Sequence, residues 1–208
     1  MSGGHVEQAK RKRRTQAERT EAAEANLLEA ALHLIGEHGA TGMTLGQVGV
    51  KAGYSRGLPT HHFGSKARLL RALADEARKR GHLDVDRDAP EEGLAFILNF
   101  ANRYVHLPRP VEMRAMHVMQ AEAIMADSEL SEPMLAFNRG TIDELAAQIE
   151  HGIARGEIAK DVEPRRSAML ILAMLRGASL LEMLDPELKK AAPALDVTRE
   201  VKALLGAK

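Results

Sequence analysis

The chain has 208 residues, and its 29 Lys and Arg are balanced by 29 Asp and Glu, so the formal net charge at pH 7 is zero. Cysteine is absent, which excludes disulfides, thiol nucleophiles and thiolate metal sites. The charge is unevenly placed, because residues 1–81 hold 14 basic against 8 acidic side chains (+6) and residues 82–208 hold 15 against 21 (−6). Such asymmetry between the two halves indicates an interaction with nucleic acid.

The N-terminus and the apolar segments give no sign of export or membrane insertion. The basic run at residues 10–14 is not followed by an apolar segment, so it does not resemble a secretory signal. The most apolar segment, residues 167–184, carries Arg176 at its middle, and no run of about 18 uncharged apolar residues occurs. We therefore expect a cytoplasmic protein that does not contact a membrane.

Composition and periodicity predict an all-α fold of about nine helices. Trp is absent, Phe and Tyr total six, and alternating β-branched runs are missing, whereas helix formers dominate. Thr15 and Thr44 each begin a capping box, and Ser55 is placed as the N-cap of a third helix. In the basic part, the sequence predicts helices at residues 15–38, 44–52, 56–62 and 66–80.

Proline residues and an acidic linker at residues 84–90 organise the rest of the chain. Proline suits the first position of a helix, and Asp is a common N-cap. The sequence predicts a short helix start at Asp185-Pro186 and longer helices at residues 90–106, 111–126, 133–155, 164–184 and 196–205.

Residues 44–63 carry the pattern of a helix-turn-helix, in which the second helix enters the major groove of DNA. Arg56 is long enough for a bidentate contact to guanine, and Gly57 allows the backbone to approach the duplex closely. Helix N-termini favour phosphate, and hydroxyl, imidazole and ammonium groups supply further donors. The candidate DNA-binding residues are Thr44, Tyr54, Ser55, Arg56, Gly57, Thr60, His61, His62 and Lys66.

At these residues the sequence resembles the tetracycline-repressor (TetR) family. The resemblance is strongest over residues 20–70 and includes Leu34-Ile35-Gly36-Glu37-His38-Gly39, Met43-Thr44-Leu45, Ala52-Gly53-Tyr54-Ser55-Arg56-Gly57 and His62-Phe63-Gly64-Ser65-Lys66. A weaker likeness covers residues 156–161 and Arg176-Gly177. Many relatives have an aromatic residue at position 60 or 61 that contacts phosphate, whereas this chain has Thr60 and His61.

The resemblance implies a homodimer that represses transcription from double-stranded DNA until a small-molecule effector binds, without a cofactor. It implies that Phe63 is buried behind the recognition helix. It also implies a basic arm and start of the first helix at residues 1–19, a DNA-binding domain at 20–65, and a connecting helix with a ligand-binding and dimerisation domain at 66–208. The basic arm is either a solvated tail or a further contact to phosphates or the minor groove.

Two stripes in the second half of the chain are candidates for an effector site. An aromatic stripe falls at i, i+4 and i+8, and a Met-rich stripe with polar groups follows on the next helix. Core packing explains the methionines equally well, since Met fills irregular gaps. The candidate ligand-binding residues are Phe96, Phe100, Tyr104, Met113, Met116, His117, Gln120, Phe137 and Met174.

The helix at residues 164–184 is apolar almost all round, which predicts burial on several sides, one of them against a second subunit. The candidate dimer residues are Gly177, Leu180, Leu181 and Leu184.

Two other classes of function remain open at this point: a helical enzyme acting on a small apolar substrate, and an interaction protein without a DNA role. No HExxH pattern or other compact catalytic constellation occurs. His33 and Glu37 stand at i, i+4, but on the helix of the DNA head. His61 and His62 are adjacent on a helix and point about 100° apart, so we expect no metal there.

Three residues of the helix-turn-helix conflict with simple helix rules. Gly46 and Gly49 lie inside its first helix, where each costs about 0.5–1 kcal/mol relative to Ala. Close packing against the first helix of the chain, or stabilisation on DNA, is needed to offset this. Pro59 falls at the fourth position of a helix that begins at Arg56, the limit that a helix start tolerates.

Overall fold

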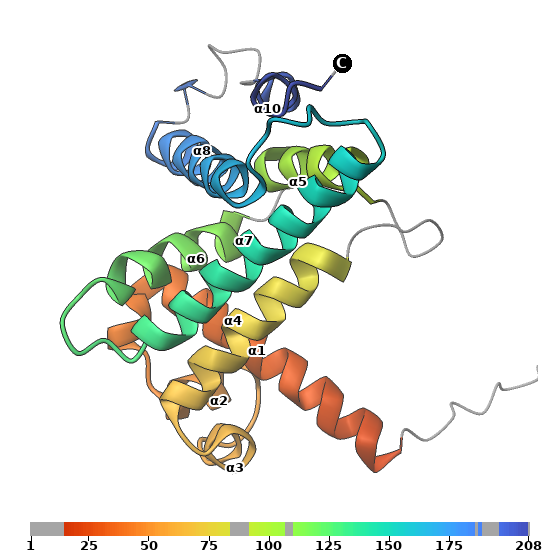
Figure 1. The fold of residues 1–208 in the computed structure, drawn as a ribbon. Helices are drawn as coiled ribbons and strands as arrows, with labels where there is room; N and C mark the ends of the chain where they lie inside the picture. The colour runs from red at the N-terminus through yellow and green to blue at the C-terminus, as the bar shows by residue number, and fades with distance from the viewer. Residues whose placement is uncertain (1–14, 84–91, 107–109, 186, 189–195, 208) are drawn as a thin grey trace, which may run out of the picture.

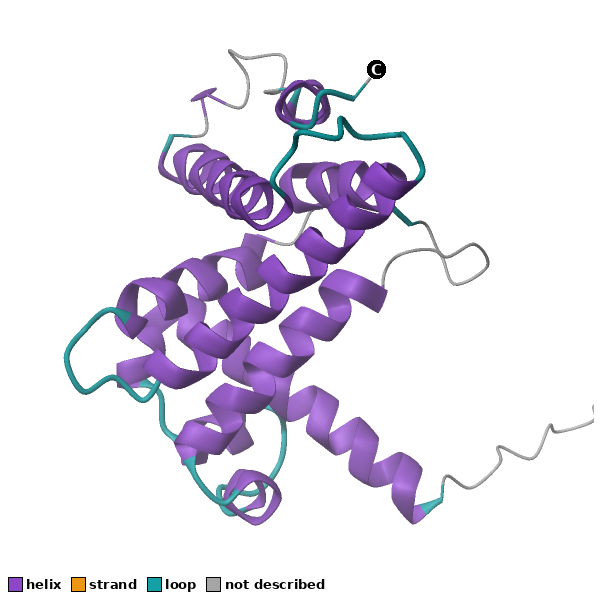
Figure 2. Cartoon of the chain, in the orientation of Figure 1, coloured by secondary structure: helices purple, strands orange, loops and turns teal. Residues whose placement is uncertain are grey.

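The computed structural model describes residues 15–83, 92–106, 110–185, 187–188 and 196–207. In this part of the chain the secondary structure is helical throughout, without strands, which confirms the all-α prediction (Figure 1, Figure 2). The helices are α1 (Gln16–Gly42), α2 (Leu45–Lys51), α3 (Leu58–Phe63), α4 (Lys66–Leu83), α5 (Leu94–His106), α6 (Pro110–Ala123), α7 (Ser131–Ala154), α8 (Pro164–Leu184) and α10 (Val197–Leu204).

Both predicted capping boxes are present. Thr15 Oγ1 accepts the Glu18 amide at 3.2 Å, and the Glu18 carboxylate accepts the Thr15 amide at 2.7 Å. Thr44 and Gln47 exchange the corresponding bonds at the start of α2, at 3.3 and 2.8 Å. The side chains thus satisfy amides that the first turn of a helix leaves without a partner.

The predicted start of α3 is wrong by two residues. Ser55 makes no capping bond, Arg56 and Gly57 form the turn, and the helix begins at Leu58. Pro59 then occupies the second helical position, where the missing N–H costs nothing because the first four amides of a helix lack helical partners. The proline therefore determines where this helix begins.

Contacts from distant residues move the start of α5. The sequence places its start at Pro90, but Glu92 and Gly93 are not helical and α5 begins at Leu94. Gly93 has φ of +64°, and its amide donates to Gln148 Oε1 at 2.8 Å, while the amide of Leu94 donates to Glu157 Oε2 at 3.1 Å. The caps thus come from α7 and the turn after it. Pro90 itself lies outside the described residues.

The other boundaries differ by a few residues or agree. Helix α6 begins one residue earlier and ends three residues earlier than predicted, and α7 begins two residues earlier. Helices α8 and α10 follow the prediction, with Asp196 Oδ1 accepting the Arg199 amide at 3.1 Å. The predicted start at Asp185-Pro186 lies largely outside the described residues.

Helix α1 contains a break at Gly39, near the predicted end of this helix, and a helical turn continues to Gly42. Gly39 has φ of +78°, a conformation that favours glycine. The Glu122 carboxylate of α6 accepts the amides of Ala40 and Thr41 at 2.9 Å each, and the Thr41 hydroxyl at 2.9 Å. A Cβ on Gly39 would lie 2.5 Å from Glu122 Oε1, so a larger residue would be strained by the backbone angle and would also displace the carboxylate.

Two apolar cores are stacked along the molecule, and α7 contributes to both. The first joins α1, α3 and α4 to Ala115 and Met119 of α6 and to Leu130 and Met134 near the start of α7. The second joins α5, α8 and α10 to the C-terminal half of α7. Figure 1 shows the helix-turn-helix at one end and α5, α8 and α10 at the other, with α6 and α7 between them. Arg71 of α4 also pairs with Glu132 of α7 at 2.5 Å.

By length and composition, α8 is long and apolar enough to cross a membrane. No other helix among the described residues meets this criterion. Buried core helices of soluble proteins pass the same test. Ile171, Leu172 and Leu175 are buried in the second core, and Arg176 lies in the middle of the helix. We therefore interpret α8 as a core helix.

Candidate DNA interface and effector site

Helices α2 and α3 pack closely because Gly49 has no side chain. A Cβ on Gly49 would lie 2.4 Å from the Ser55 carbonyl oxygen and 3.1 Å from Pro59 Cδ. The Tyr54 amide donates to the Gly49 carbonyl at 2.8 Å and closes the turn. Close packing therefore accounts for Gly49, but the partner is the turn before α3 and not α1, against which the packing was expected. A Cβ on Gly46 would meet Arg56 Cβ at an ordinary 3.9 Å, so packing does not require glycine there.

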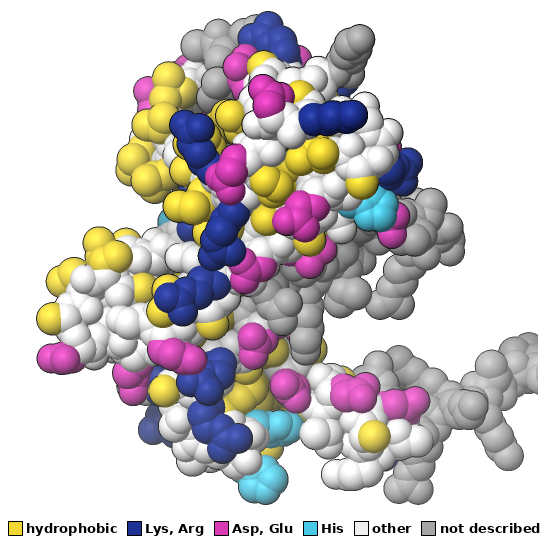
Figure 3. Space-filling view, in the orientation of Figure 1, with side chains coloured by type: hydrophobic (Ala, Val, Ile, Leu, Met, Phe, Trp, Pro, Cys, Tyr) yellow, Lys and Arg dark blue, Asp and Glu magenta, His cyan; other side chains and the backbone are white. Residues whose placement is uncertain are grey.

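The recognition helix presents polar side chains to solvent. Arg56, Thr60 and His61 are exposed, as are Ser55 and Gly57 at the turn. Behind them, Phe63 is buried in the first core, as the resemblance implies. Figure 3 shows histidine side chains at this end of the molecule, in the region of α3. This face can offer a guanidinium, hydroxyl and imidazole to a duplex.

Three other candidate DNA-binding residues have intramolecular partners. The Thr44 hydroxyl takes part in the α2 capping box. The Tyr54 hydroxyl accepts from Asn26 Nδ2 at 3.1 Å and so ties the turn to α1. Lys66 Nζ donates to the Thr41 carbonyl at 3.1 Å. These bonds stabilise the head. His62 is half-buried, with its ring 6.1 Å from that of Phe63.

The candidate effector residues come from α5, α6, α7 and α8: Met116 and Phe137 pack against the first core, and Phe96, Phe100, Tyr104 and Met174 belong to or pack against the second. Phe96 is buried in the second core, and the rings of Phe100 and Tyr104 lie 6.0 Å apart. His117 Nε2 lies 3.1 Å from Ser179 Oγ of α8. The remaining candidates are all partly buried: Met113, Met116, Gln120, Phe137 and Met174.

Arg176 of α8 is the charged group of this region. Its Nη2 donates to Asn138 Oδ1 at 2.7 Å, and its Cζ lies 6.0 Å from the centre of the Phe137 ring. Burial raises the pKa of the Tyr104 hydroxyl, an effect that Arg176 partly offsets. Burial and, to a lesser extent, Arg176 lower the pKa of His117. At neutral pH Tyr104 and His117 are therefore uncharged, and the guanidinium is positive.

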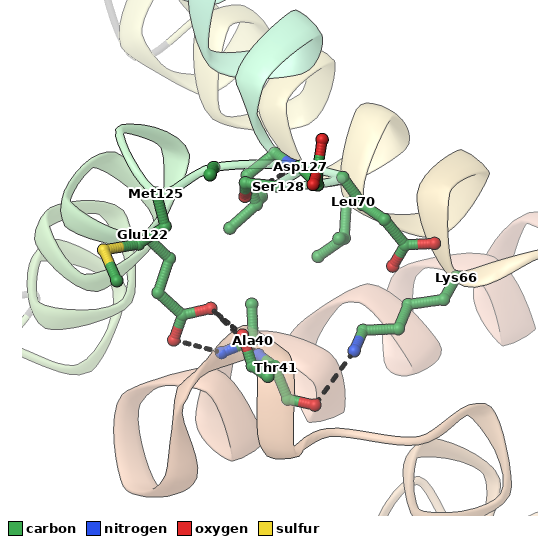
Figure 4. Close-up of a pocket in the computed structure, with 11 residues that line it drawn as sticks. Ala40, Thr41, Lys66, Leu70, Glu122, Met125, Asp127 and Ser128 are labelled. Carbon is green, nitrogen blue, oxygen red and sulfur yellow. Dashed lines mark hydrogen bonds between the residues drawn. The ribbon is translucent and has the colours of Figure 1, made fainter.

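A separate hollow of about 260 Å³ lies at the junction of head and body (Figure 4). It is bounded by Thr41 and Lys66 of the head, by Glu122, and by the loop at residues 125–130. None of the nine candidate effector residues lines it. The hydrogen bonds that Glu122 makes to Ala40 and Thr41, and that Lys66 makes to the Thr41 carbonyl, border this hollow. The hollow therefore lies where the head contacts the body.

Helix α8 exposes an apolar face that includes all four candidate dimer residues. Leu180, Leu181 and Leu184 are 42%, 54% and 74% exposed, and a Cβ on Gly177 would meet no atom within 4 Å. Figure 3 shows apolar side chains gathered over α8. The dimer prediction did not include two further exposed apolar residues of α8, Met169 and Leu170. The spacing of residues 170, 173, 177, 181 and 184, close to 3.5, was a usable signal for this face.

Glu37, which the sequence places at i, i+4 from His33, pairs with a lysine of α2. Glu37 binds Lys51 Nζ at 2.8 Å, and this bond lowers the pKa of the Glu37 carboxyl. Within the described ranges, no group of three or more His, Asp or Glu is arranged to hold a metal ion.

Two family models match the chain. Residues 27–73 match the model described as bacterial regulatory proteins of the tetR family. Residues 101–206 match the model described as the C-terminal part of BetI-type transcriptional repressors. The second match covers half of the chain and includes every candidate effector residue from Tyr104 onward, as well as α8.

Curated relatives and a solved structure agree with these models. The chain is 38% identical over 85 residues to the regulator CymR of Pseudomonas putida, covering 39% of this chain and 42% of that protein. It is 29% identical over 148 residues to the regulator BetI of Agrobacterium fabrum, covering 62% and 69%. A crystal structure described as a TetR-family regulator from Rhodococcus sp. superposes with a TM-score of 0.76 at 19% identity, covering 89% of this chain and 97% of that one.

The packing at Gly49 gives a matched pair of substitutions. We expect Gly49→Ala to destabilise the head by about 1–3 kcal/mol, because the new Cβ overlaps a backbone carbonyl. Gly46→Ala on the same helix should be neutral or stabilising by about 0.5–1 kcal/mol. Thermal unfolding of both variants tests this, and a Gly49→Ala protein as stable as Gly46→Ala would contradict the packing described here.

Proposed function

Because the chain belongs to the TetR family of bacterial regulatory proteins, we propose that it is a transcriptional repressor which binds a pseudo-palindromic DNA site as a homodimer and is released by a small apolar or amphipathic effector. The observation that carries the proposal is the helix-turn-helix, in which Arg56 at the turn and Thr60 and His61 on α3 are exposed in front of the buried Phe63. Nothing comparable supports an enzyme or an interaction protein without a DNA role.

The proposed DNA interface divides the candidate residues by role. Arg56, at the turn that opens α3, reads a base edge, with Thr60 and His61 contacting bases or phosphates beside it. Ser55 and Gly57 allow the backbone to approach phosphates. The residues with intramolecular hydrogen bonds (Thr44, Tyr54 and Lys66) and the half-buried His62 position the head and add contacts at its edge. Thr60 and His61 replace the aromatic phosphate contact of many relatives.

The proposed dimer uses the exposed apolar face of α8, through Leu180, Leu181 and Leu184, with Gly177 allowing close approach. Exposing such an apolar face to water is unfavourable in free energy, and faces of this kind are typical of protein interfaces. Two recognition helices would then stand about 34–36 Å apart, one turn of DNA. The effector would bind more tightly to a conformation in which the two heads have a different spacing. It would therefore increase the population of that conformation and lower the affinity of the dimer for DNA.

We assign residues 20–65 to the DNA-binding domain and residues 66–208 to the connecting helix and regulatory body, with residues 1–19 as a basic arm and the start of α1. The net charge supports this division. The +6 part ends near the end of α4, and the −6 body is repelled by DNA, so the head is oriented toward it. A cytoplasmic location follows from contact with DNA.

Substitution of Arg56 tests the DNA interface. Arg56→Ala should weaken binding to the preferred site by about 1–3 kcal/mol and relax specificity at one base position, because it removes a base contact from an exposed side chain. Lys66→Ala should weaken binding to all sequences and reduce the salt slope by about 1. Fluorescence anisotropy with DNA from the promoter beside the gene, across a salt series, measures both.

Arg166→Ala is the matched control, since Arg166 is also exposed but lies on α8, and its DNA affinity should equal that of the wild type. Circular dichroism checks that each variant is folded. Sequence-independent binding by the wild type, or an Arg56→Ala affinity equal to that of Arg166→Ala, would refute the proposed interface.

A charge on the apolar face of α8 tests the dimer. Leu181→Asp should shift the protein from dimer to monomer in analytical ultracentrifugation, because it places a carboxylate in a desolvated contact. Leu135→Asp is the control, since Leu135 on α7 is similarly exposed, at 47% against 54%. A wild type that sediments as a monomer, or a Leu181→Asp protein that remains dimeric, would rule out this interface.

A further inference from the structure

Arg176 of α8 is a partly buried arginine of the body that has no carboxylate partner among the described residues. Arg176 Nη2 is held by Asn138, but its Nε–H is buried and has no hydrogen-bond partner. No carboxylate in the described part of the chain forms an ion pair with Arg176. An arginine cannot lose its charge under physiological conditions, so the protein keeps a positive charge here.

The groups facing Arg176 do not compensate this charge. Tyr104 and His117 are its titratable neighbours: burial raises the pKa of the Tyr104 hydroxyl, which the charge of Arg176 and a hydrogen bond with it partly offset, and burial lowers the pKa of His117, so neither side chain supplies a negative charge near neutral pH. Asn138 and Ser179 add neutral polar atoms. The region therefore carries one net positive charge, together with hydroxyl, imidazole and guanidinium donors. A partly buried charge whose Nε–H is shielded from water is costly unless something binds to it.

The surroundings of Arg176 are otherwise apolar and aromatic. The centre of the Phe137 ring lies 6.0 Å from Cζ of the guanidinium, and the Phe100 ring lies beside that of Tyr104 at a tilt of 52°. Phe137 and Met116 border the first core, whereas Tyr104 and Met174 border the second. A molecule at this position would contact both cores, and through α6 and α7 it would act on the head.

We propose that Arg176 binds the carboxylate of an amphipathic organic acid, and that such acids are the class of effector that this protein senses. The free Nε–H is one arm of the planar fork with which guanidinium groups hold carboxylates. The aromatic and Met side chains around it suit an aryl or alkyl body. This inference rests on the proposed function, since it names the effector class of the same regulatory body.

The test uses the full chain and four carboxylates, each paired with its uncharged amide: benzoate, phenylacetate, hexanoate and decanoate. Isothermal titration calorimetry and thermal shift measure binding. At least one acid should bind roughly 10- to 100-fold more tightly than its amide, the effect of a hydrogen bond to a charged group. The same acid should release the protein from its DNA site. Benzyltrimethylammonium, a cation with a similar aryl group, should not bind.

Two variants of α8 assign the effect to Arg176. Arg176→Met should reduce the affinity for the acid to that for the amide, and its melting temperature without ligand should equal or exceed that of the wild type, since a partly buried charge with an unsatisfied Nε–H is removed. Arg166→Met, exposed on the same helix, should bind the acid like the wild type. If Arg176→Met does not fold, Arg176→Lys should retain part of the preference, because it keeps the charge and loses the fork.

The proposal is overturned if no acid binds more tightly than its amide, if the cation binds in preference, or if the acid preference survives Arg176→Met. DNA binding without any added compound is measured in parallel. Intact sequence-specific binding with no acid preference would overturn the effector class alone, whereas loss of specific DNA binding would overturn the proposed function.

Discussion

The carboxylate of Glu122 joins the two ends of this molecule. It accepts two amides and a hydroxyl from Ala40 and Thr41, at the point where α1 breaks at Gly39. Free amides at the start of a helical turn favour an anionic acceptor, and hydrogen bonds to a carboxylate are stronger than those between neutral groups. Because Glu122 belongs to α6 and the break belongs to the head, the position of α2 and α3 depends on the position of α6.

The regulatory body is placed to use this connection. Helix α6 carries Glu122 near its C-terminal end and His117 just over one turn earlier, and His117 lies beside Ser179 and the Arg176 region of α8. Anything that changes the packing around Arg176 therefore acts on the helix that holds the head. Helix α7 provides a second link, since it contributes to both cores and its Glu132 pairs with Arg71 of α4.

Local chemistry made much of the fold predictable. Both capping boxes, the C-terminal break at Gly39 and the bounds of α8 and α10 follow from side chains within a few residues of each helix end. The starts of α3 and α5 were predicted less well. The start of α3 depends on the steric limit of Pro59, and the start of α5 depends on hydrogen bonds to the distant residues Gln148 and Glu157. In the site, aromatic and Met spacing indicated the effector region, but Glu122, Asn138 and Ser179 gave no local signal because their partners are 38 to 82 positions away.

The most direct test of the connection is calorimetric unfolding of Glu122→Ala beside the wild type. The substitution leaves the amides of Ala40 and Thr41 without their partner, and the loss at the partly buried Ala40 donor costs about 1–3 kcal/mol, whereas water can replace the bond to the exposed Thr41 amide. If Glu122 couples the head to the body, the wild type unfolds in one transition and the variant shows a separate, earlier transition of the head. A variant that unfolds in a single transition at the wild-type temperature would contradict the central role given to Glu122.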